Sequence, residues 1–385
     1  MVKRTVCVIS GSRAEYGLLQ PIMKEIKKDA DLILQVVAAG MHLSPEFGLT
    51  YKKIEEDGFI IDEKVEMLLS TDTGVGTAKS IGLGVIGFAD VFDRLKPDIV
   101  LLLGDRYEIL AAAQAALILR IPVAHIAGGD STEGAFDESI RHSITKMAHL
   151  HFVNNEVSAM RVRQLGENPD YIFNVGSPGI DTITRLDLLS RQELEQALGF
   201  RFRSKNFLIT FHPATLDQIS SAQQLQEIFK AIDCLDLDLG VIFTHCNADP
   251  EGRIINLMID DYVAEHSRAR AFSSLGQRLY LSTIAQVDAV VGNSSSGLYE
   301  VPSFKKPTVN IGSRQSGRIQ ASSIINCQPE AADIIKAIEE AFMMDCSNCK
   351  NPYGDGNASS QIAAILKSIP NYKDLLIKPF FTLEC

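Results

Sequence analysis

Chemically active side chains collect in one stretch of the chain, residues 101–149. One apolar run there leads into Asp105 and Arg106, and a second leads through two glycines into Asp130. Such runs are typical of strands in a parallel α/β sheet, whose carboxyl ends face the ligand crevice. We therefore expect these three side chains, with His125 on the second strand, to point into one crevice. Carboxylates and an arginine there could transfer protons and stabilise an anion.

The helix predicted after the second strand adds charged side chains to the same crevice. Asp137 and Arg141 are four residues apart and therefore share a helix face, with Glu138 and His142 beside them. These residues could serve the helix alone, by complementing its dipole or forming an ordinary salt bridge. Their position next to a Gly-Gly turn and a second strand-end aspartate favours a role in the site.

Three other segments offer donors to an anion. A Gly-Ser turn precedes Arg13 at the start of a predicted helix, and residues 292–297 read GNSSSG after a buried strand. Backbone N–H groups and hydroxyls at such helix starts bind phosphate, although serines there can also be ordinary N-caps. Residues 312–318 carry two arginines that could neutralise a diphosphate, and Glu300 could accept hydrogen bonds from ribose hydroxyls.

The alternation of strands and helices predicts the fold class. It runs from residue 5 to about residue 176 and restarts at Phe207, which indicates an α/β protein with two doubly wound, Rossmann-like domains. In the second series His212 ends a strand on the expected crevice side, so we favour a functional role for it. The apolar helix predicted over residues 74–95 should be buried on more than one side. A subunit contact would account for this burial, and we expect a homodimer or homotetramer.

Composition excludes several classes of partner. The 385 residues are 46% hydrophobic and carry a formal net charge of -11, without a Lys/Arg block. We therefore expect neither a nucleic-acid nor a membrane partner. The start, MVKRTVCVIS, lacks a signal-peptide pattern. Seven cysteines without framework spacing indicate reduced thiols in a cytoplasmic protein, and the pair Cys346 and Cys349 lacks further ligands for a metal.

Seven segments in order carry a family resemblance. They are SGSRAEYG (10–17), LGDRYE (103–108), HIAGGD to DESIRHSITK (125–146), FHPAT (211–215), GNSSSG with Glu300, NIGSRQSGR (310–318) and YGDGNA (353–358). Together they resemble the hydrolysing UDP-N-acetylglucosamine 2-epimerases of the sialic-acid pathway, over nearly the whole chain.

The resemblance implies an architecture and a reaction. The fold would be glycosyltransferase-B-like, with residues 1–172 and 366–385 in one domain, residues 173–365 in a UDP-binding domain and an active-site cleft between them. UDP would leave in an elimination that removes the proton on sugar carbon 2. Water would then add to the 2-acetamidoglycal and release N-acetylmannosamine. The partners would be a UDP-sugar and UDP, and neither a cofactor nor a metal is implied.

The resemblance also implies roles for individual residues. Asp105 and Asp137 would be catalytic carboxylates, and His212 would lie against the diphosphate and act in catalysis. The UDP-binding residues would be Arg13, Ala14, Glu15, Arg106, His212, Asn247, Ser294, Ser295, Glu300 and Arg314.

One position departs from the family pattern. Many members have a catalytic glutamate as the third residue of the His-Ile-x-Gly-Gly segment, where this chain has Ala127. Asp130 or Glu133 could replace that carboxylate. Alternatively, the change could mark a legionaminic-type enzyme acting on UDP-N,N'-diacetylbacillosamine. Outside the family, a glycosyltransferase or a nucleotide-sugar sensor would also explain the UDP contacts.

Overall fold

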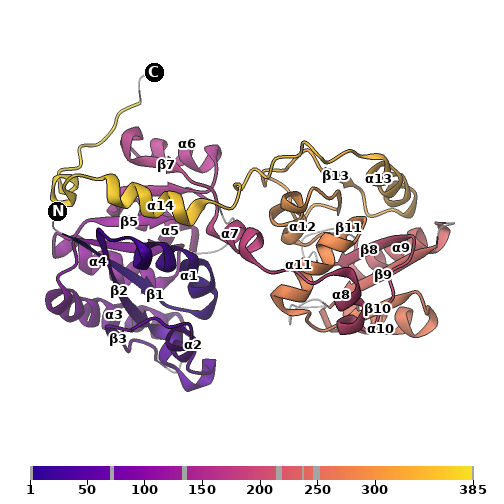
Figure 1. The fold of residues 1–385 in the computed structure, drawn as a ribbon, viewed down its shortest axis with the longest axis horizontal. Helices are drawn as coiled ribbons and strands as arrows, with labels where there is room; N and C mark the ends of the chain where they lie inside the picture. The colour runs from indigo at the N-terminus through magenta and orange to yellow at the C-terminus, as the bar shows by residue number, and fades with distance from the viewer. Residues whose placement is uncertain are drawn as a thin grey trace. The chain divides into compact units, whose positions relative to one another are not determined.

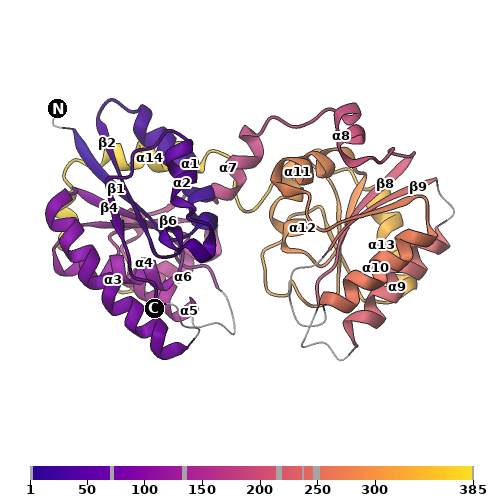
Figure 2. The ribbon, with the colours of Figure 1, turned by 90° about the horizontal axis from the view of Figure 1, so that it is seen from below.

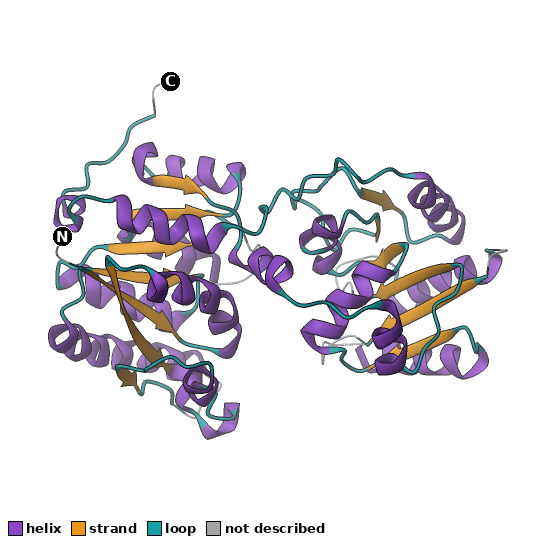
Figure 3. Ribbon diagram, in the orientation of Figure 1, coloured by secondary structure: helices purple, strands orange, loops and turns teal. Residues whose placement is uncertain are grey.

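The chain forms two compact units. The computed structural model describes residues 3–69, 73–131, 137–213, 219–235, 238–245 and 252–383. Unit 1 comprises Met1–Thr182 and Tyr353–Cys385, and unit 2 comprises Ile183–Pro352. Each unit is built on a parallel sheet flanked by helices (Figures 1 and 3). The predicted α/β class with two Rossmann-like units is confirmed.

Unit 1 contains a seven-stranded sheet in the order β3-β2-β1-β4-β5-β6-β7. The chain reverses its direction of travel across the sheet between β1 and β4, which makes their carboxyl ends the expected ligand-binding edge. The strands are β1 (Arg4–Ser10), β2 (Leu32–Ala39), β3 (Glu63–Val65), β4 (Ile99–Leu103), β5 (Val123–Ile126), β6 (Leu150–Val153) and β7 (Ile172–Asn174).

Helices cover both faces of this sheet because alternate strand residues face opposite sides. Val6 and Val8 of β1 pack in one core, and Cys7 and Ile9 pack in another. The first core includes residues of α14, which lies beside α1 in Figure 1. The helices are α1 (Arg13–Lys28), α2 (Tyr51–Glu56), α3 (Gly74–Leu95), α4 (Tyr107–Ile118), α5 (Asp137–Met147), α6 (Glu156–Gln164), α7 (Pro178–Arg185) and α14 (Ala358–Ser368).

The division between the units differs from the expected boundaries at residues 173 and 365. Those positions would cut through β7, which pairs with β6, and through α14. The fully buried Asp181 of α7 accepts hydrogen bonds from the backbone N–H groups of Ala358 (3.0 Å) and Ser359 (2.7 Å). This carboxylate caps α14 from another helix, so the whole of α14 belongs to unit 1.

Within the single chain α3 is buried on one side, and its burial on a further side by a subunit contact stays a prediction. Its buried residues form a single stripe from Gly76 through Ser80, Gly84 and Phe88 to Phe92. The helix packs along α4 on that side, and Figure 2 shows the two helices in the same unit. By length and composition alone, α3 could cross a membrane, and a third of its apolar window is buried in the unit.

Unit 2 repeats the same topology with six parallel strands. The order β10-β9-β8-β11-β12-β13 again reverses beside the first strand, here β8. The strands are β8 (Lys205–Thr210), β9 (Leu239–Thr244), β10 (Ala269–Phe272), β11 (Ala289–Gly292), β12 (Thr308–Ile311) and β13 (Ile324–Cys327). The helices are α8 (Arg191–Leu198), α9 (Ser221–Cys234), α10 (Gly252–Glu265), α11 (Gly276–Gln286), α12 (Ser295–Tyr299) and α13 (Ala331–Met343).

Candidate active site

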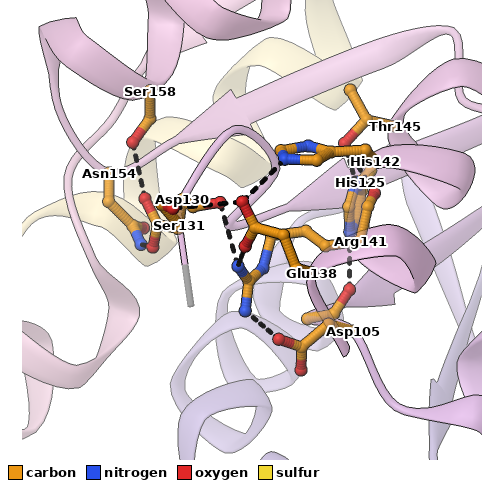
Figure 4. Close-up of polar contacts among 11 residues, drawn as sticks. Asp105, His125, Asp130, Ser131, Glu138, Arg141, His142, Thr145, Asn154 and Ser158 are labelled. Carbon is orange, nitrogen blue, oxygen red and sulfur yellow. Dashed lines mark hydrogen bonds and ion pairs between the residues drawn. The ribbon is translucent and has the colours of Figure 1, made fainter. Parts of the chain in front are cut away.

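An ion pair joins β4 to α5 at the carboxyl edge of the unit 1 sheet. One guanidinium nitrogen of Arg141 donates a hydrogen bond to the carboxylate of Asp105, and another donates one to Glu138 at 3.2 Å (Figure 4). The Arg141 side chain is only 7% exposed, whereas that of Asp105 is 25% exposed. The buried arginine therefore fixes the position of a carboxylate that solvent or a ligand can still reach.

Asp130 is held from the neighbouring strand and helix. Its carboxylate accepts hydrogen bonds from Asn154 Nδ2 at 2.6 Å and from Ser158 Oγ at 2.5 Å, and its carbonyl accepts one from Arg141 at 2.9 Å. The preceding Gly129 has φ +79°, and a Cβ there would lie 2.3 Å from the Ser158 carbonyl oxygen. These contacts favour a structural role for Asp130, which ties the glycine turn to α6.

The first turns of α5 present two further carboxylates. Glu138 accepts hydrogen bonds from Ser131 Oγ (3.0 Å) and lies 3.1 Å from His142 Nε2. Asp137 is the first residue of α5, and no hydrogen bond or ion pair joins it to another residue among those described. Asp137 is thus the carboxylate on this helix that remains available for proton transfer. Glu133 lies outside the described residues.

His125 does not point into the crevice as expected. It is fully buried, with Nε2 2.7 Å from the Gly104 carbonyl oxygen and Nδ1 3.1 Å from Thr145 Oγ1. Burial lowers the pKa of this imidazole to about 4. A neutral His125 therefore braces β4, β5 and α5 from within, where both of its ring nitrogens have hydrogen-bond partners.

Ala127 directly follows β5 and has a left-handed backbone conformation. Its φ is +63°, its N–H donates to the Phe152 carbonyl oxygen at 2.9 Å, and its methyl packs against the apolar core. At this position the chain carries no group that can transfer a proton.

The turn after β1 is closed by its own glutamate, Glu15, whose contact with UDP stays a prediction. Glu15 Oε2 accepts hydrogen bonds from the N–H groups of Gly11 (2.6 Å) and Ser12 (3.1 Å) in a capping box. The side chain is buried, and burial, with the nearby Glu108 carboxylate, raises its pKa to about 7. Arg13 and Ala14, by contrast, are exposed in the first turn of α1.

Arg106 is partly committed to neighbouring carboxylates. It donates to Glu108 Oε1 at 2.9 Å and lies 3.8 Å from Glu15, and its side chain is 34% exposed. Glu108 is fully buried and packs so close to Gly40 that a Cβ there would be 2.8 Å from Glu108 Cγ. Arg106 therefore stabilises two buried carboxylates while keeping a partly accessible face.

In unit 2 the strand ends meet at Asn293. Its side chain exchanges hydrogen bonds with the backbone of His212, at 2.7 Å to the N–H and 2.8 Å to the carbonyl oxygen. Its own carbonyl oxygen accepts from Arg314 (3.1 Å) and Gln315 (2.7 Å). The ends of β8, β11 and β12 are thereby tied together, with His212 half-buried and Arg314 exposed.

A chain of hydroxyl groups leads from α11 to Glu300. Tyr280 donates to Ser296 Oγ at 2.9 Å, and Ser296 donates in turn to the Glu300 carboxylate. Burial raises the pKa of Glu300, and it raises that of Tyr280 to about 12. Ser294 is the N-cap of α12, and Gly292 at φ +133° permits the turn because a Cβ would meet the Thr210 carbonyl oxygen.

The two strand-end groups suit different chemistry. Unit 1 offers carboxylates with fixed positions, which can remove and return protons. Unit 2 offers hydroxyl, amide and guanidinium donors, which can bind a phosphorylated ligand. Sequence reasoning missed Asn293 as the junction, although it lies in the GNSSSG segment, and it missed Tyr280, for which the sequence carries no signal. Asn247 lies outside the described residues.

Comparison with known proteins identifies the class and the family. A UDP-N-acetylglucosamine 2-epimerase from Neisseria meningitidis, solved with UDP-N-acetylglucosamine, superposes with a TM-score of 0.78 over 95% of this chain and all of its own, at 20% identity. The fold is therefore that of the glycosyltransferase-B-like 2-epimerases. The model of the UDP-N-acetylglucosamine 2-epimerase family matches residues 24–367, and the chain belongs to this family.

Three relatives are similar over most of the chain. A GDP/UDP-N,N'-diacetylbacillosamine 2-epimerase (hydrolyzing) from Campylobacter jejuni is 44% identical over 88% of each protein. A UDP-N,N'-diacetylbacillosamine 2-epimerase (hydrolyzing) from Legionella pneumophila is 36% identical, covering 97% of this chain and 98% of its own. The polysialic acid biosynthesis protein P7 of Escherichia coli is also 36% identical, covering 99% and 98%.

Proposed function

We propose that this protein is a hydrolysing 2-epimerase of nucleotide-linked N,N'-diacetylbacillosamine. The enzyme would release the nucleoside diphosphate and the free sugar inverted at carbon 2. The 44% identity to the Campylobacter jejuni relative carries the choice of sugar. The second candidate substrate is UDP-N-acetylglucosamine, as in the sialic-acid pathway. This candidate draws support from the Escherichia coli relative.

The acid–base chemistry is assigned to unit 1. Removing the proton on carbon 2 while the diphosphate leaves carbon 1 requires a base. Hydrating the resulting glycal with inversion requires an acid that returns a proton to the opposite face of carbon 2 while water adds to carbon 1. Asp105, positioned by the buried Arg141, and the uncommitted Asp137 supply two such groups. With Ala127 in place of the family's glutamate, these two carboxylates carry the proton transfers, and Asp130 holds the turn between them and α6.

The nucleotide is assigned to the donors of unit 2, with a contribution from arginines of unit 1. Ser294, Ser295 and Arg314 would hold the diphosphate, His212 would contact its oxygens, and Glu300 would accept hydrogen bonds from the ribose. Arg13 and the accessible face of Arg106 would stabilise the charge of the leaving diphosphate. Ala14 in the first turn of α1 and Asn247 complete the proposed nucleotide contacts. We also propose that the protein is a homo-oligomer in the cytoplasm.

A substrate comparison tests the choice of sugar. Release of the nucleoside diphosphate is measured for UDP-N,N'-diacetylbacillosamine, its GDP counterpart and UDP-N-acetylglucosamine. We expect kcat/KM to be at least about 100-fold higher for one of the diacetamido sugars, because a site built around an additional acetamido group leaves polar groups unpaired with the smaller sugar. Equal or reversed values would reject this sugar and favour the sialic-acid reaction.

A further inference from the structure

A cavity lies at the opposite edge of the unit 1 sheet from the candidate site. Its volume is about 810 Å³, and its lining includes Arg4, Asp98 and Pro122, which start or directly precede β1, β4 and β5. The candidate site occupies the carboxyl ends of the same strands, so the two are separated by the length of the sheet. A cavity of this size can accommodate a small organic molecule.

The cavity is rich in positive charge in a protein that is acidic overall. Five cationic residues line it, Lys3, Arg4, Lys96, Arg120 and Lys373, together with two carboxylates, Asp93 and Asp98. One carboxylate is already engaged, since Asp98 accepts the Thr5 N–H at 2.8 Å, and Arg4 already donates to the carbonyl oxygens of Leu366 and Lys367. The formal charge of the whole chain is -11. A concentration of cations against this background attracts an anion.

Two of these cations occupy left-handed backbone positions, which glycine adopts more readily than other residues. Lys96, with φ +46°, ends α3, and Arg120, with φ +58°, follows the C-cap of α4. Left-handed residues at helix ends are usually glycine, because a Cβ is disfavoured there. A lysine or arginine could complement the helix dipole equally well from within the last turn. The chain instead places both cations at the two positions that face the cavity.

Part of the remaining lining is apolar and buried. Phe92 and Tyr372 are at most 4% exposed, and Pro97 and Pro122 are also buried. Tyr372 is fixed by a hydrogen bond to the Leu366 carbonyl oxygen, and Arg4 lies 5.7 Å from its ring centroid. The cavity therefore combines an apolar, partly aromatic base with a cationic rim.

From this combination we propose that the cavity is a binding site for a small organic polyanion with a planar or apolar body, of the nucleoside-phosphate class. The rim cations would bind the charged groups, and the rings and prolines would contact the body of the ligand. Because the site lies at the other edge of the sheet from the catalytic carboxylates, its ligand is not the sugar substrate. The proposal does not depend on which sugar the enzyme uses.

A tryptophan reporter tests the proposal directly, because the protein contains no tryptophan. Leu119→Trp places a reporter in the cavity lining, at a residue that is 40% exposed. Ile254→Trp, at a residue of unit 2 that is 53% exposed, is the matched control. The probes are adenosine 5'-diphosphate, inorganic pyrophosphate and adenosine. We expect saturable changes with the diphosphate in the Leu119→Trp protein alone, weaker binding of pyrophosphate and none of adenosine.

Two further substitutions separate recognition from folding. Lys96→Gly and Arg120→Gly, each combined with Leu119→Trp, remove a cation and leave a residue suited to the left-handed conformation. Each should weaken binding at least about tenfold without lowering the melting temperature. Lys305→Gly, at a left-handed lysine of unit 2 with φ +55°, should leave binding unchanged. No saturable response to either phosphate, or a response that both glycine variants retain, would overturn the proposal.

Discussion

The strand ends of the two units are built on the same topology but with opposite chemistry. In unit 1 they carry charges that are paired with one another, such as Asp105 with Arg141 and Glu108 with Arg106. In unit 2 they carry mostly neutral donors and acceptors, centred on Asn293 and on the Tyr280–Ser296–Glu300 chain. One doubly wound sheet can thus present paired charges or neutral donors and acceptors, depending on the residues that follow its strands.

The largest expected effect comes from removing the carboxylate that Arg141 positions. Asp105→Asn keeps the shape of the side chain but cannot accept a proton, so kcat should fall about 1,000-fold while the KM for the nucleotide sugar changes little. Steady-state kinetics check this. The matched control is Asp90→Asn on the exposed surface of α3, which should leave kcat unchanged. A variant of Asp105 within a few-fold of the original rate would remove the acid–base assignment from unit 1.

Acid should separate the stabilities of the two units. Burial lowers the pKa of His42, His125 and His149 in unit 1 to about 4 each. The unfolded chain takes up these protons near pH 6.5 and the folded unit does not, so stability is lost as the pH falls from about 6.5 to 4. Each histidine contributes on the order of 3 kcal/mol at most.

Hydrogen exchange followed by mass spectrometry between pH 7 and 4.5 measures this difference. Peptides of unit 1 should lose protection at a higher pH than peptides of unit 2. The variant His149→Asn retains an acceptor for the Val123 N–H, which His149 binds at 3.1 Å, and should shift the unit 1 transition to lower pH. Loss of protection in both units at one pH would contradict the contrast.

A smaller effect is expected from Glu300 of unit 2, which we propose accepts hydrogen bonds from the ribose. Glu300→Gln should raise the dissociation constant of UDP about tenfold, since one charged hydrogen bond is replaced by a neutral one, and should leave kcat nearly unchanged. Isothermal titration and kinetics together measure both quantities. Tyr280→Phe, which removes only the outer hydroxyl of the chain, is the milder companion variant. A loss confined to kcat would place Glu300 in catalysis instead.

Substitution of Asp130 should affect stability more than rate. Because its carboxylate is occupied by Asn154 and Ser158, Asp130→Asn should lower kcat by less than about fivefold and the free energy of unfolding by about 1–2 kcal/mol. Thermal unfolding and kinetics measure the two effects. A loss of kcat comparable with that of Asp105→Asn would show that Asp130 replaces the carboxylate absent at Ala127.

The sequence predicted the elements well where their pattern is strong. The helix predicted over residues 74–95 agrees with α3, and the apolar runs before Asp105 and Asp130 form β4 and β5, because apolar runs and turn residues mark these elements. The same apolar runs predicted which strand ends carry the candidate site. The expected orientation of one side chain was wrong: His125 turns inward, since a hydrogen bond to the Gly104 carbonyl oxygen satisfies it there.

Contacts between distant segments were beyond the sequence for a physical reason. Tyr280 reaches Ser296 only because α11 packs beside α12, and Asp181 caps α14 from 177 residues away. Such pairs leave no periodic or local pattern. The apolar residues of α3 predicted burial on several sides, yet one stripe alone is covered within the chain.

Proton NMR in deuterium oxide tests the central claim most directly. The purified protein is supplied with UDP-N,N'-diacetylbacillosamine and, in parallel, with UDP-N-acetylglucosamine. We predict free UDP and a free diacetamido sugar that is inverted at carbon 2 and carries deuterium there, with little turnover of the second substrate. Turnover of UDP-N-acetylglucosamine alone, or a product that keeps its original proton on carbon 2, would contradict the account.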